Sequence, residues 1–368
     1  MASRIVVFGA TGYTGELTAR ALVERGARPV LAARNEERVR ALAADLGGVE
    51  WAVADAERPD SLRALVDRGD VLVATVGPFA RWGRPAVEAA IAAGADYLDS
   101  TWEGTFIREV FERYGPQAQA AGCRLVTAFG YDWVPGNLAG ALALRAAGEE
   151  ATRLEIGYFN PGTGASSSSG GTRASSAGVM LSPGFAWHGG QLVEQRQARH
   201  GRSFELRPGT EARAVSVSAS EHFALPRLHP GLRDVEVYLG WFGSASEPLR
   251  GLSAALEPVL GLPGARDGLQ SLFGRLVKGS SGGPDAAARA GVRSIILAEA
   301  YDAAGTRLAG ARLEGINFYD FTANVLAWGA ETAAAGGLQG AGALGPVDGF
   351  GLEALEAGCA EAGIARVS

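Results

Sequence analysis

The sequence predicts an α/β protein whose first part is a helix-covered parallel sheet and whose second part is an α+β domain with a mainly antiparallel sheet. From residue 4 to about residue 129, short apolar segments alternate with amphipathic ones. Continuous apolar strands joined by helices are typical of parallel sheets buried on both faces. After about residue 150 the segments become short and alternating, with Pro and Gly between them, as in antiparallel sheets. A chain of 368 residues also favours two packed units over a single core.

The first domain is expected over residues 1–135. Its strands are predicted at residues 5–8, 29–33, 49–53, 71–76, 97–98 and 124–128, and its helices at residues 14–25, 36–46, 60–68, 84–93 and 104–121. The second of these helices shows the reasoning, because Val39, Leu42 and Leu46 recur at helical spacing after Asn35, a residue that caps helices well.

A second, α+β domain is expected over residues 136–316, and C-terminal helices over residues 317–368 that can pack back on the first domain. A further helix reaches Ala147, and strands are predicted at residues 152–159 and within 204–242. Broken helices follow at 244–290, then a hairpin of residues 293–301 and 309–316, then helices at 318–335 and 350–362. The Gly/Ser/Thr-rich run at 162–176 is either a linker or a segment that closes over a ligand.

Composition excludes several classes of protein. The chain is 47% hydrophobic and 20% charged, with a net charge of −6. This balance is that of a globular protein and argues against nucleic acid or an anionic membrane surface as the main partner. Two cysteines indicate a reducing compartment, so we expect a cytoplasmic protein, and the four histidines lie at no metal-ligand spacing. No segment of about 20 residues is apolar enough to span a membrane.

A glycine-rich turn follows the first predicted strand and opens the first helix. Residues 9–15 read Gly-Ala-Thr-Gly-Tyr-Thr-Gly, a variant of the dinucleotide fingerprint of Rossmann domains. Its first glycine permits a tight turn, the second lets backbone approach a diphosphate, and the third lets helix and sheet pack closely. The helix N-terminus adds N–H groups and a partial positive charge. The expected cofactor-binding residues here are Gly9, Thr11, Gly12, Tyr13, Thr14 and Gly15.

The end of the second strand indicates which dinucleotide binds. An NAD site places an acid there to hold the ribose hydroxyl, but this chain has Arg34 and Asn35 instead. A guanidinium can form a charge-assisted fork with a 2′-phosphate, with Arg38 alongside, so NADPH is the expected cofactor. Alternatively, Arg34 is a solvated residue at a helix start.

Two further segments are expected to border the cofactor. Asp55 follows the third strand and lies beside the adenine in this hypothesis, although a helix-capping role explains it as well. Gly77, Pro78 and Phe79 follow the fourth strand, and ligands of open α/β sheets bind beyond the carboxyl ends of strands. We therefore expect these three residues near the nicotinamide ribose.

Together, three motifs resemble the saccharopine dehydrogenase-like superfamily. They are the turn at 9–15, Val-Gly-Pro-Phe at 76–79 and Gly-Ala-Asp-Tyr-Leu-Asp at 94–99. The turn Gly-Tyr-Asp-Trp-Val-Pro-Gly at 130–136 is similar to that of the bacterial branch of saccharopine reductases and trans-acting enoyl reductases. The resemblance implies a Rossmann domain, NADP(H) and a substrate domain whose sheet helps to dimerise. The chain departs from the family at 100–103, where many members have Gly-Glu and this one has Ser-Thr-Trp-Glu.

Hydride transfer needs orientation and, in most cases, a proton source, so candidates are sought on the loops after strands four to six. Tyr131 could protonate an enolate or alkoxide, and Asp132 could orient water or pair with an iminium. A packing role for the tyrosine and a turn-capping role for the aspartate stay open. The expected substrate-site residues are Trp82, Asp99, Trp102, Trp133 and His188. Aromatic side chains suit a bulky apolar substrate, but interdomain packing, a structural ion pair and an ordinary surface histidine are the alternatives.

The sequence thus predicts an NADPH-dependent reductase that transfers hydride to a C=C or C=N bond of a hydrophobic metabolite, free or tethered to a carrier protein. A cytoplasmic homodimer without a metal, a nucleic-acid partner or a membrane span is expected. Two alternatives stay open. One is an amino-acid-linked dehydrogenase of the saccharopine type, which needs cationic groups for substrate carboxylates. The other is a non-catalytic NADPH-binding sensor or assembly protein.

Overall fold

The structure, a computed structural model, describes residues 3–161, 182–241, 246–260 and 282–367. The chain divides into two compact units. The first comprises Met1–Trp102, Phe106–Val134 and Phe318–Gly363, and the second comprises Glu103–Thr105, Pro135–Asn317 and Ile364–Ser368. The predicted loop at 162–176 lies outside the described residues.

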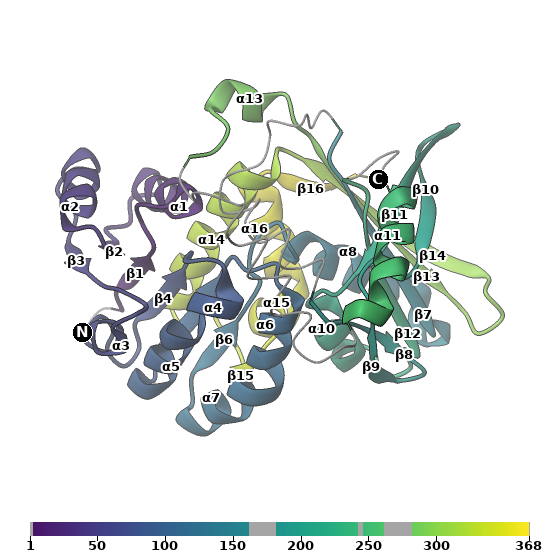
Figure 1. The fold of residues 1–368 in the computed structure, drawn as a ribbon, viewed down its shortest axis with the longest axis horizontal. Coiled ribbons are helices and arrows are strands. Elements are labelled where there is room, and N and C mark those ends of the chain that lie inside the picture. Colours follow the sequence, from purple (N-terminus) through teal and green to yellow (C-terminus); the bar gives the residue numbers. More distant parts are fainter. Residues whose placement is uncertain (1–2, 162–181, 242–245, 261–281, 368) are drawn as a thin grey trace. The chain divides into compact units, whose positions relative to one another are not determined.

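The first unit is built on a seven-stranded parallel sheet with the order β15-β6-β5-β4-β1-β2-β3 (Figure 1). Its strands are β1 (Ile5–Phe8), β2 (Val30–Ala33), β3 (Trp51–Val53), β4 (Val71–Ala74), β5 (Asp96–Asp99), β6 (Arg124–Val126) and β15 (Gly342–Ala343). Every residue of β1, β2, β4 and β5 is buried, as the apolar segments predicted. The predicted Rossmann-type sheet is thereby confirmed.

Helices from both ends of the chain complete this unit. They are α1 (Tyr13–Glu24), α2 (Glu36–Asp45), α3 (Pro59–Arg63), α4 (Phe79–Trp82), α5 (Arg84–Ala93), α6 (Gly104–Glu109), α7 (Gly115–Ala121), α14 (Phe318–Ala334), α15 (Pro346–Phe350) and α16 (Leu352–Ala362). Helix α14, coloured yellow-green in Figure 1, packs against α1 and also contacts β4 and β5. Arg25 at the end of α1 pairs with Glu331 of α14 and Glu361 of α16, each at 2.5 Å.

The helix predicted at 104–121 is interrupted. A π-helical turn, η1 (Val110–Tyr114), separates α6 from α7. Pro116 sits in the first turn of α7 and has no N–H to donate to the preceding turn. The interruption therefore falls where proline removes one hydrogen bond of a regular helix.

The second unit contains a mixed sheet with the order β10-β11-β12-β7-β13-β14-β16, to which β8 and β9 are added beside β12. Its strands are β7 (Arg153–Phe159), β8 (Gly184–His188), β9 (Gln191–Gln195), β10 (Gly201–Arg207), β11 (Thr210–Val217), β12 (Asp234–Leu239), β13 (Ser294–Tyr301), β14 (Arg307–Gly315) and β16 (Ile364–Val367). Within the described ranges β7 and β12 run parallel and the remaining pairs are antiparallel. The mainly antiparallel second sheet is confirmed.

Helices α8 (Val134–Ala147) and α10 (Glu221–Leu228) cover one face of this sheet. A Cβ built on Gly140 of α8 would lie 2.6 Å from Leu225 of α10 and 3.1 Å from Leu154 of β7. The glycine thus allows the close approach of helix, helix and sheet. The described ranges also contain helices α11 (Ser246–Leu260) and α13 (Ala286–Ala290), and a 3₁₀ turn, η2 (Gly148–Glu150), follows α8.

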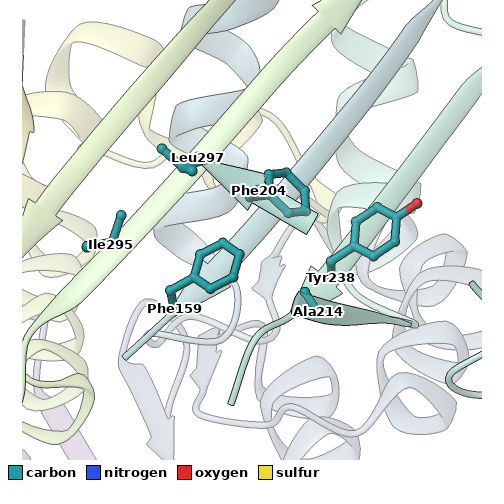
Figure 2. Packing of buried hydrophobic residues seen from close by; sticks show 6 residues of the cluster. All are labelled: Phe159, Phe204, Ala214, Tyr238, Ile295 and Leu297. Carbon is teal, nitrogen blue, oxygen red and sulfur yellow. The ribbon is translucent and has the colours of Figure 1, made fainter. Parts of the chain in front are cut away.

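The opposite face carries a hydrophobic cluster of six buried residues, Phe159, Phe204, Ala214, Tyr238, Ile295 and Leu297. Figure 2 shows the Phe204 ring of β10 beside Phe159 of β7 and Tyr238 of β12, with ring centroids 5.5 and 5.6 Å away. Strand β10 is the edge of the pairing order, yet its Phe204 contacts a central strand, so this edge curls over the sheet face.

An ion-pair network extends this contact. Arg202, two residues before Phe204 on β10, forms ion pairs with Glu155 of β7 and Glu299 of β13. These two glutamates are directly opposite each other in the sheet, where like charges repel. The guanidinium, 4.3 Å above the Phe204 ring, therefore neutralises a like-charge pair while it fixes the curled strand.

Three elements differ from the predictions for the chain after residue 204. Helix α10 lies in a region that was predicted as strands, because the buried Ala224 and Leu225 in one turn of this helix serve to cover the sheet. The short strands β15 and β16 were not predicted either. Both depend on partners distant in sequence, β6 and β14, which no local pattern reveals. Among the described residues no helix is long and apolar enough to cross a bilayer.

Candidate functional site: a dinucleotide cradle and a buried carboxyl

The glycine turn has the backbone that a dinucleotide site requires. Gly9 has φ +93°, and a Cβ there would lie 2.7 Å from both Thr75 Oγ1 and Val76 Cγ2. A Cβ on Gly15 would lie 2.2 Å from the carbonyl oxygen of Gly9. Both positions therefore require glycine for the turn to form and for α1 to lie against the turn.

Gly12 is different, because the protein itself leaves room for a side chain there. A Cβ on Gly12 would meet only the Gly9 carbonyl oxygen, at 3.2 Å. Gly12 stands at the N-cap of α1, is exposed and offers no side-chain cap to the helix. Free approach to helix N–H groups is what a bound diphosphate needs, so these residues fit a dinucleotide.

The remaining residues of the turn are held by neighbouring helices. The carbonyl of Thr11 accepts a hydrogen bond from Arg38 of α2 at 3.1 Å. Tyr13 packs edge-on against Tyr319 of α14, with centroids 4.9 Å apart, and Thr14 lies in the first turn of α1. The cradle is thus braced from both sides by helices of its own unit.

The end of β2 offers a cation and no acid. Arg34 is exposed and makes no ion pair or hydrogen bond with any residue that the structure describes. Asn35 caps α2, since its Oδ1 accepts from the Arg38 backbone N–H at 2.9 Å. The Arg34 guanidinium therefore remains available for a phosphate, while Asn35 also has a structural role.

The residues expected beside adenine and ribose follow β3 and β4. Asp55 Oδ1 accepts from the Glu57 N–H at 3.0 Å, which forms a tight turn before α3. Gly77 and Pro78 are joined by a cis peptide bond. Phe79 begins α4 and is buried, with its ring 5.6 Å from that of Phe106. These residues shape the ends of the two strands.

Asp99, the last residue of β5, is fully buried. Its carboxylate accepts from the backbone N–H groups of Thr101 and Ala128 at 2.9 Å each, and from Thr127 Oγ1 at 2.7 Å. Burial raises the pKa of Asp99 to about 6, and these hydrogen bonds oppose the rise. Because its acceptor positions are used by the chain, we propose that Asp99 fixes the turn after β6 rather than touching a substrate.

That turn carries Tyr131 and Asp132. The backbone N–H of Tyr131 donates to Thr322 Oγ1 of α14 at 3.0 Å, and its buried ring lies near Phe318 and Phe321. Asp132 is partly exposed as a residue, yet its Oδ1 is buried without a hydrogen-bond partner among the described residues. Burial alone raises the pKa of the Asp132 carboxyl to about 7. A carboxyl of this kind can hold a proton near neutral pH and release it.

The four other substrate-site candidates differ in exposure. Trp82 is partly exposed under the Arg81 guanidinium, at 4.3 Å, and Trp102 is partly exposed after β5. Trp133 is fully buried. His188 lies in the second unit, exposed and 2.5 Å from Asp234. Their roles toward a substrate stay predictions.

Sequence reasoning missed a buried polar cluster in the second unit. Tyr158 Oη donates to Glu221 Oε1 at 2.6 Å, and Asn137 Nδ2 donates to Ser220 Oγ at 3.0 Å; all four residues are buried. The signal was the polar run Ser-Ala-Ser-Glu-His at 218–222, which an ordinary strand of a two-layer sheet would not bury.

Comparisons with known proteins agree with a dinucleotide site at the glycine turn of residues 9–15. Residues 5–126 match the family model described as the saccharopine dehydrogenase NADP binding domain. The chain is 44% identical over 140 residues to a trans-acting enoyl reductase of Mycobacterium leprae. This match covers 36% of this chain and 34% of that protein. A protein of the same name from Mycobacterium ulcerans is 41% identical over 154 residues, or 40% and 37% of the two chains. The matches therefore span little more than a third of the relatives' length.

A structural comparison extends to the second unit. The apo saccharopine dehydrogenase (L-Glu forming) of Saccharomyces cerevisiae covers 96% of both chains with a TM-score of 0.60 and 13% identity. At that identity the likeness concerns the fold. The resemblance predicted from the motifs is borne out over residues 5–126, which match the model of a saccharopine dehydrogenase NADP-binding domain and so indicate NADP(H) as the cofactor.

Proposed function

We propose that this protein is an NADPH-dependent reductase that reduces the C=C bond of an enoyl substrate. The observation that carries the proposal is Asp132 Oδ1, which lies in the same unit as the NADP-binding turn and is buried with no hydrogen-bond partner among the residues that the structure describes. The name of the relatives, trans-acting enoyl reductase, supports the substrate class.

The residues divide the work as follows. The turn from Gly9 to Gly15 receives the diphosphate, and Arg34 receives the 2′-phosphate. When bound, NADPH would supply the hydride for the β-carbon of the enoyl group. Protonated Asp132 would donate its proton to the α-carbon, so that the C=C double bond becomes a C–C single bond with one new C–H bond on each carbon, and Asp132 is left as a carboxylate. Solvent then returns the proton, and burial restores the neutral acid.

The test is NADPH oxidation against a panel of enoyl thioesters, cyclic imines, ketones and lysine-derived dicarboxylates. We expect turnover with enoyl thioesters, and a loss of about 10²-fold or more in kcat for Asp132→Asn with unchanged NADPH affinity. Tyr131→Phe serves as the matched variant, and we expect it to retain most of the activity. Turnover of imines alone would favour C=N reduction, and turnover of dicarboxylates alone would favour the saccharopine-type dehydrogenase. NADPH binding without any turnover would favour the sensor.

Carrier tethering and oligomeric state belong to the same proposal. We propose that the substrate is presented as a thioester on a carrier protein, in keeping with the relatives' description as trans-acting. A kcat/KM that is higher for carrier-bound than for coenzyme A-bound enoyl groups would support this. We also propose a homodimer, which light scattering tests by a mass twice that of one chain. Cys123 and Cys359 are buried and unpaired, which suits the reducing cytoplasm that we propose as its compartment.

A further inference from the structure

The β11–α10 connection, by which we mean residues 218–222 and thus include the first two residues of α10, is polar and buried in the second unit. Ser218, Ser220, Glu221 and His222 are each less than 5% exposed. Charged and polar side chains are rarely buried without a specific partner. The partners of this connection indicate what it holds in place.

Its strongest contact lies against the beginning of helix α8. Tyr158 Oη donates to Glu221 Oε1 at 2.6 Å, the length of a charge-assisted hydrogen bond. A Cβ on Gly136, the third residue of α8, would lie 1.9 Å from Tyr158 Oη and 2.3 Å from Glu221 Oε1. Only glycine lets both polar groups reach the helix backbone this closely, so the pair rests directly on the first turn of α8.

A second hydrogen bond reinforces this contact. Asn137, the next residue of α8, donates to Ser220 Oγ at 3.0 Å. Burial lowers the pKa of the neighbouring His222 to about 4, so this histidine is neutral near pH 7. Two consecutive residues of α8 are therefore tied to the β11–α10 connection.

The first turn of α8 is continuous with the turn that carries Asp132. The Val134 N–H donates to the Gly130 carbonyl and the Trp133 N–H to the Ala128 carbonyl, each at 3.0 Å. Only three residues separate Asp132 from Gly136, and one of them, Trp133, is fully buried. A hydrogen-bonded segment this short transmits a shift of the helix start to the carboxyl.

We infer that Tyr158 and Glu221 are positioning residues for Asp132, because they hold the start of α8, and the turn that carries Asp132 leads directly into this helix. The inference rests on the proposed function of Asp132 as the proton donor. Neither residue needs to touch the substrate. They keep the protonated Asp132 carboxyl in position and shielded from water.

The test compares Tyr158→Phe and Glu221→Gln with Tyr238→Phe, a matched control whose ring is buried in the hydrophobic cluster on the opposite face of the same sheet. For the first two variants we expect kcat for the enoyl substrate to fall about tenfold or more, with NADPH affinity unchanged, since misplacement by about 1 Å costs up to about 10²-fold. The double variant Tyr158→Phe/Glu221→Gln should lose no more than the worse single one, because both act through one contact. Tyr238→Phe should keep its kcat.

The pH profile separates positioning from general stability. Asp132 acts as an acid, so kcat falls as the pH rises through its pKa. Burial raises this pKa, and no charged side chain among the described residues contributes to the rise. A loosened turn admits water and lowers that pKa, so the alkaline limb of kcat should move to lower pH in the two variants. Asp99 is also a buried acid near this turn, but its hydrogen bonds are kept in both variants. The limb of the pH profile that disappears in Asp132→Asn is the one that belongs to Asp132.

An unmoved limb and an unchanged kcat in Tyr158→Phe and Glu221→Gln would overturn the inference, and so would equal losses in Tyr238→Phe. These results are distinct from failure of the proposed function, in which the unaltered protein reduces no enoyl substrate or Asp132→Asn keeps full activity.

Discussion

Replacing Asp132 by Asn should make the protein more stable above neutral pH while it removes the proposed proton donor. Asparagine has nearly the shape of aspartic acid but does not ionise. Burial raises the pKa of the Asp132 carboxyl from 3.8 to about 7. In the folded protein the acid therefore keeps its proton over a pH range in which the unfolded chain has already lost it.

The size of this effect follows from proton linkage. Below about pH 4 both states hold the proton, and ionisation of Asp132 costs no stability. Between about pH 4 and about pH 7 the free energy of unfolding falls by about 1.4 kcal/mol per pH unit, which reaches about 4 kcal/mol in total. Because part of the residue reaches the surface, and relaxation and water penetration reduce such penalties, we expect about half of this, ~2 kcal/mol.

Urea unfolding of both proteins at about pH 4 and about pH 8 measures the difference. Asp132→Asn should exceed the unaltered protein in stability at the higher pH and match it at the lower. Asp60→Asn, which removes an exposed carboxylate in the same unit, should show no such pH-dependent gain. A gain that is absent at the higher pH, or that grows as the pH falls, would refute a carboxyl that is buried and neutral.

Four further substitutions test the rest of the structure. Gly12→Ala should fold normally but weaken NADPH binding by about tenfold or more. Gly15→Ala should destabilise the protein by about 1–3 kcal/mol, because the new Cβ would clash with the Gly9 backbone. Thermal unfolding and NADPH fluorescence titration distinguish the two outcomes. Arg34→Asp should weaken NADPH binding by about 10–100-fold and NADH binding far less in calorimetric titrations, and equal losses would exclude a 2′-phosphate contact. Arg202→Met should lower the free energy of unfolding by about 3 kcal/mol, because two opposed glutamates lose their shared cation, whereas the exposed Arg207→Met should change it little in the same urea titration.

The cofactor turn could be predicted from sequence because its requirements are local. The φ of Gly9 and the approach of Gly15 to the Gly9 carbonyl arise within seven residues, between a strand and a helix that each have a clear pattern. The parallel sheet was predictable for the same reason, since its apolar strands are continuous.

The burial and the hydrogen-bond partners of each acid could not be predicted from the sequence. No local pattern around Asp99 shows that donors from residues 127 and 128 reach its carboxylate. The Tyr158–Glu221 pair joins residues 63 positions apart, and only the three-dimensional fold shows that both rest on Gly136. Burial and partners distant in sequence determine what a carboxyl can do.

The discontinuity of the first unit has a consequence for its synthesis. Residues 318–363 supply α14, α15, α16 and the edge strand β15, although the match to the NADP-binding domain ends at residue 126. A nascent chain that has emerged only through the last N-terminal strand would expose the surface of α1 that α14 later covers. Completion of the cofactor-binding unit must therefore wait until the ribosome has translated residues 318–363, and a fragment ending near residue 134 should be prone to aggregation.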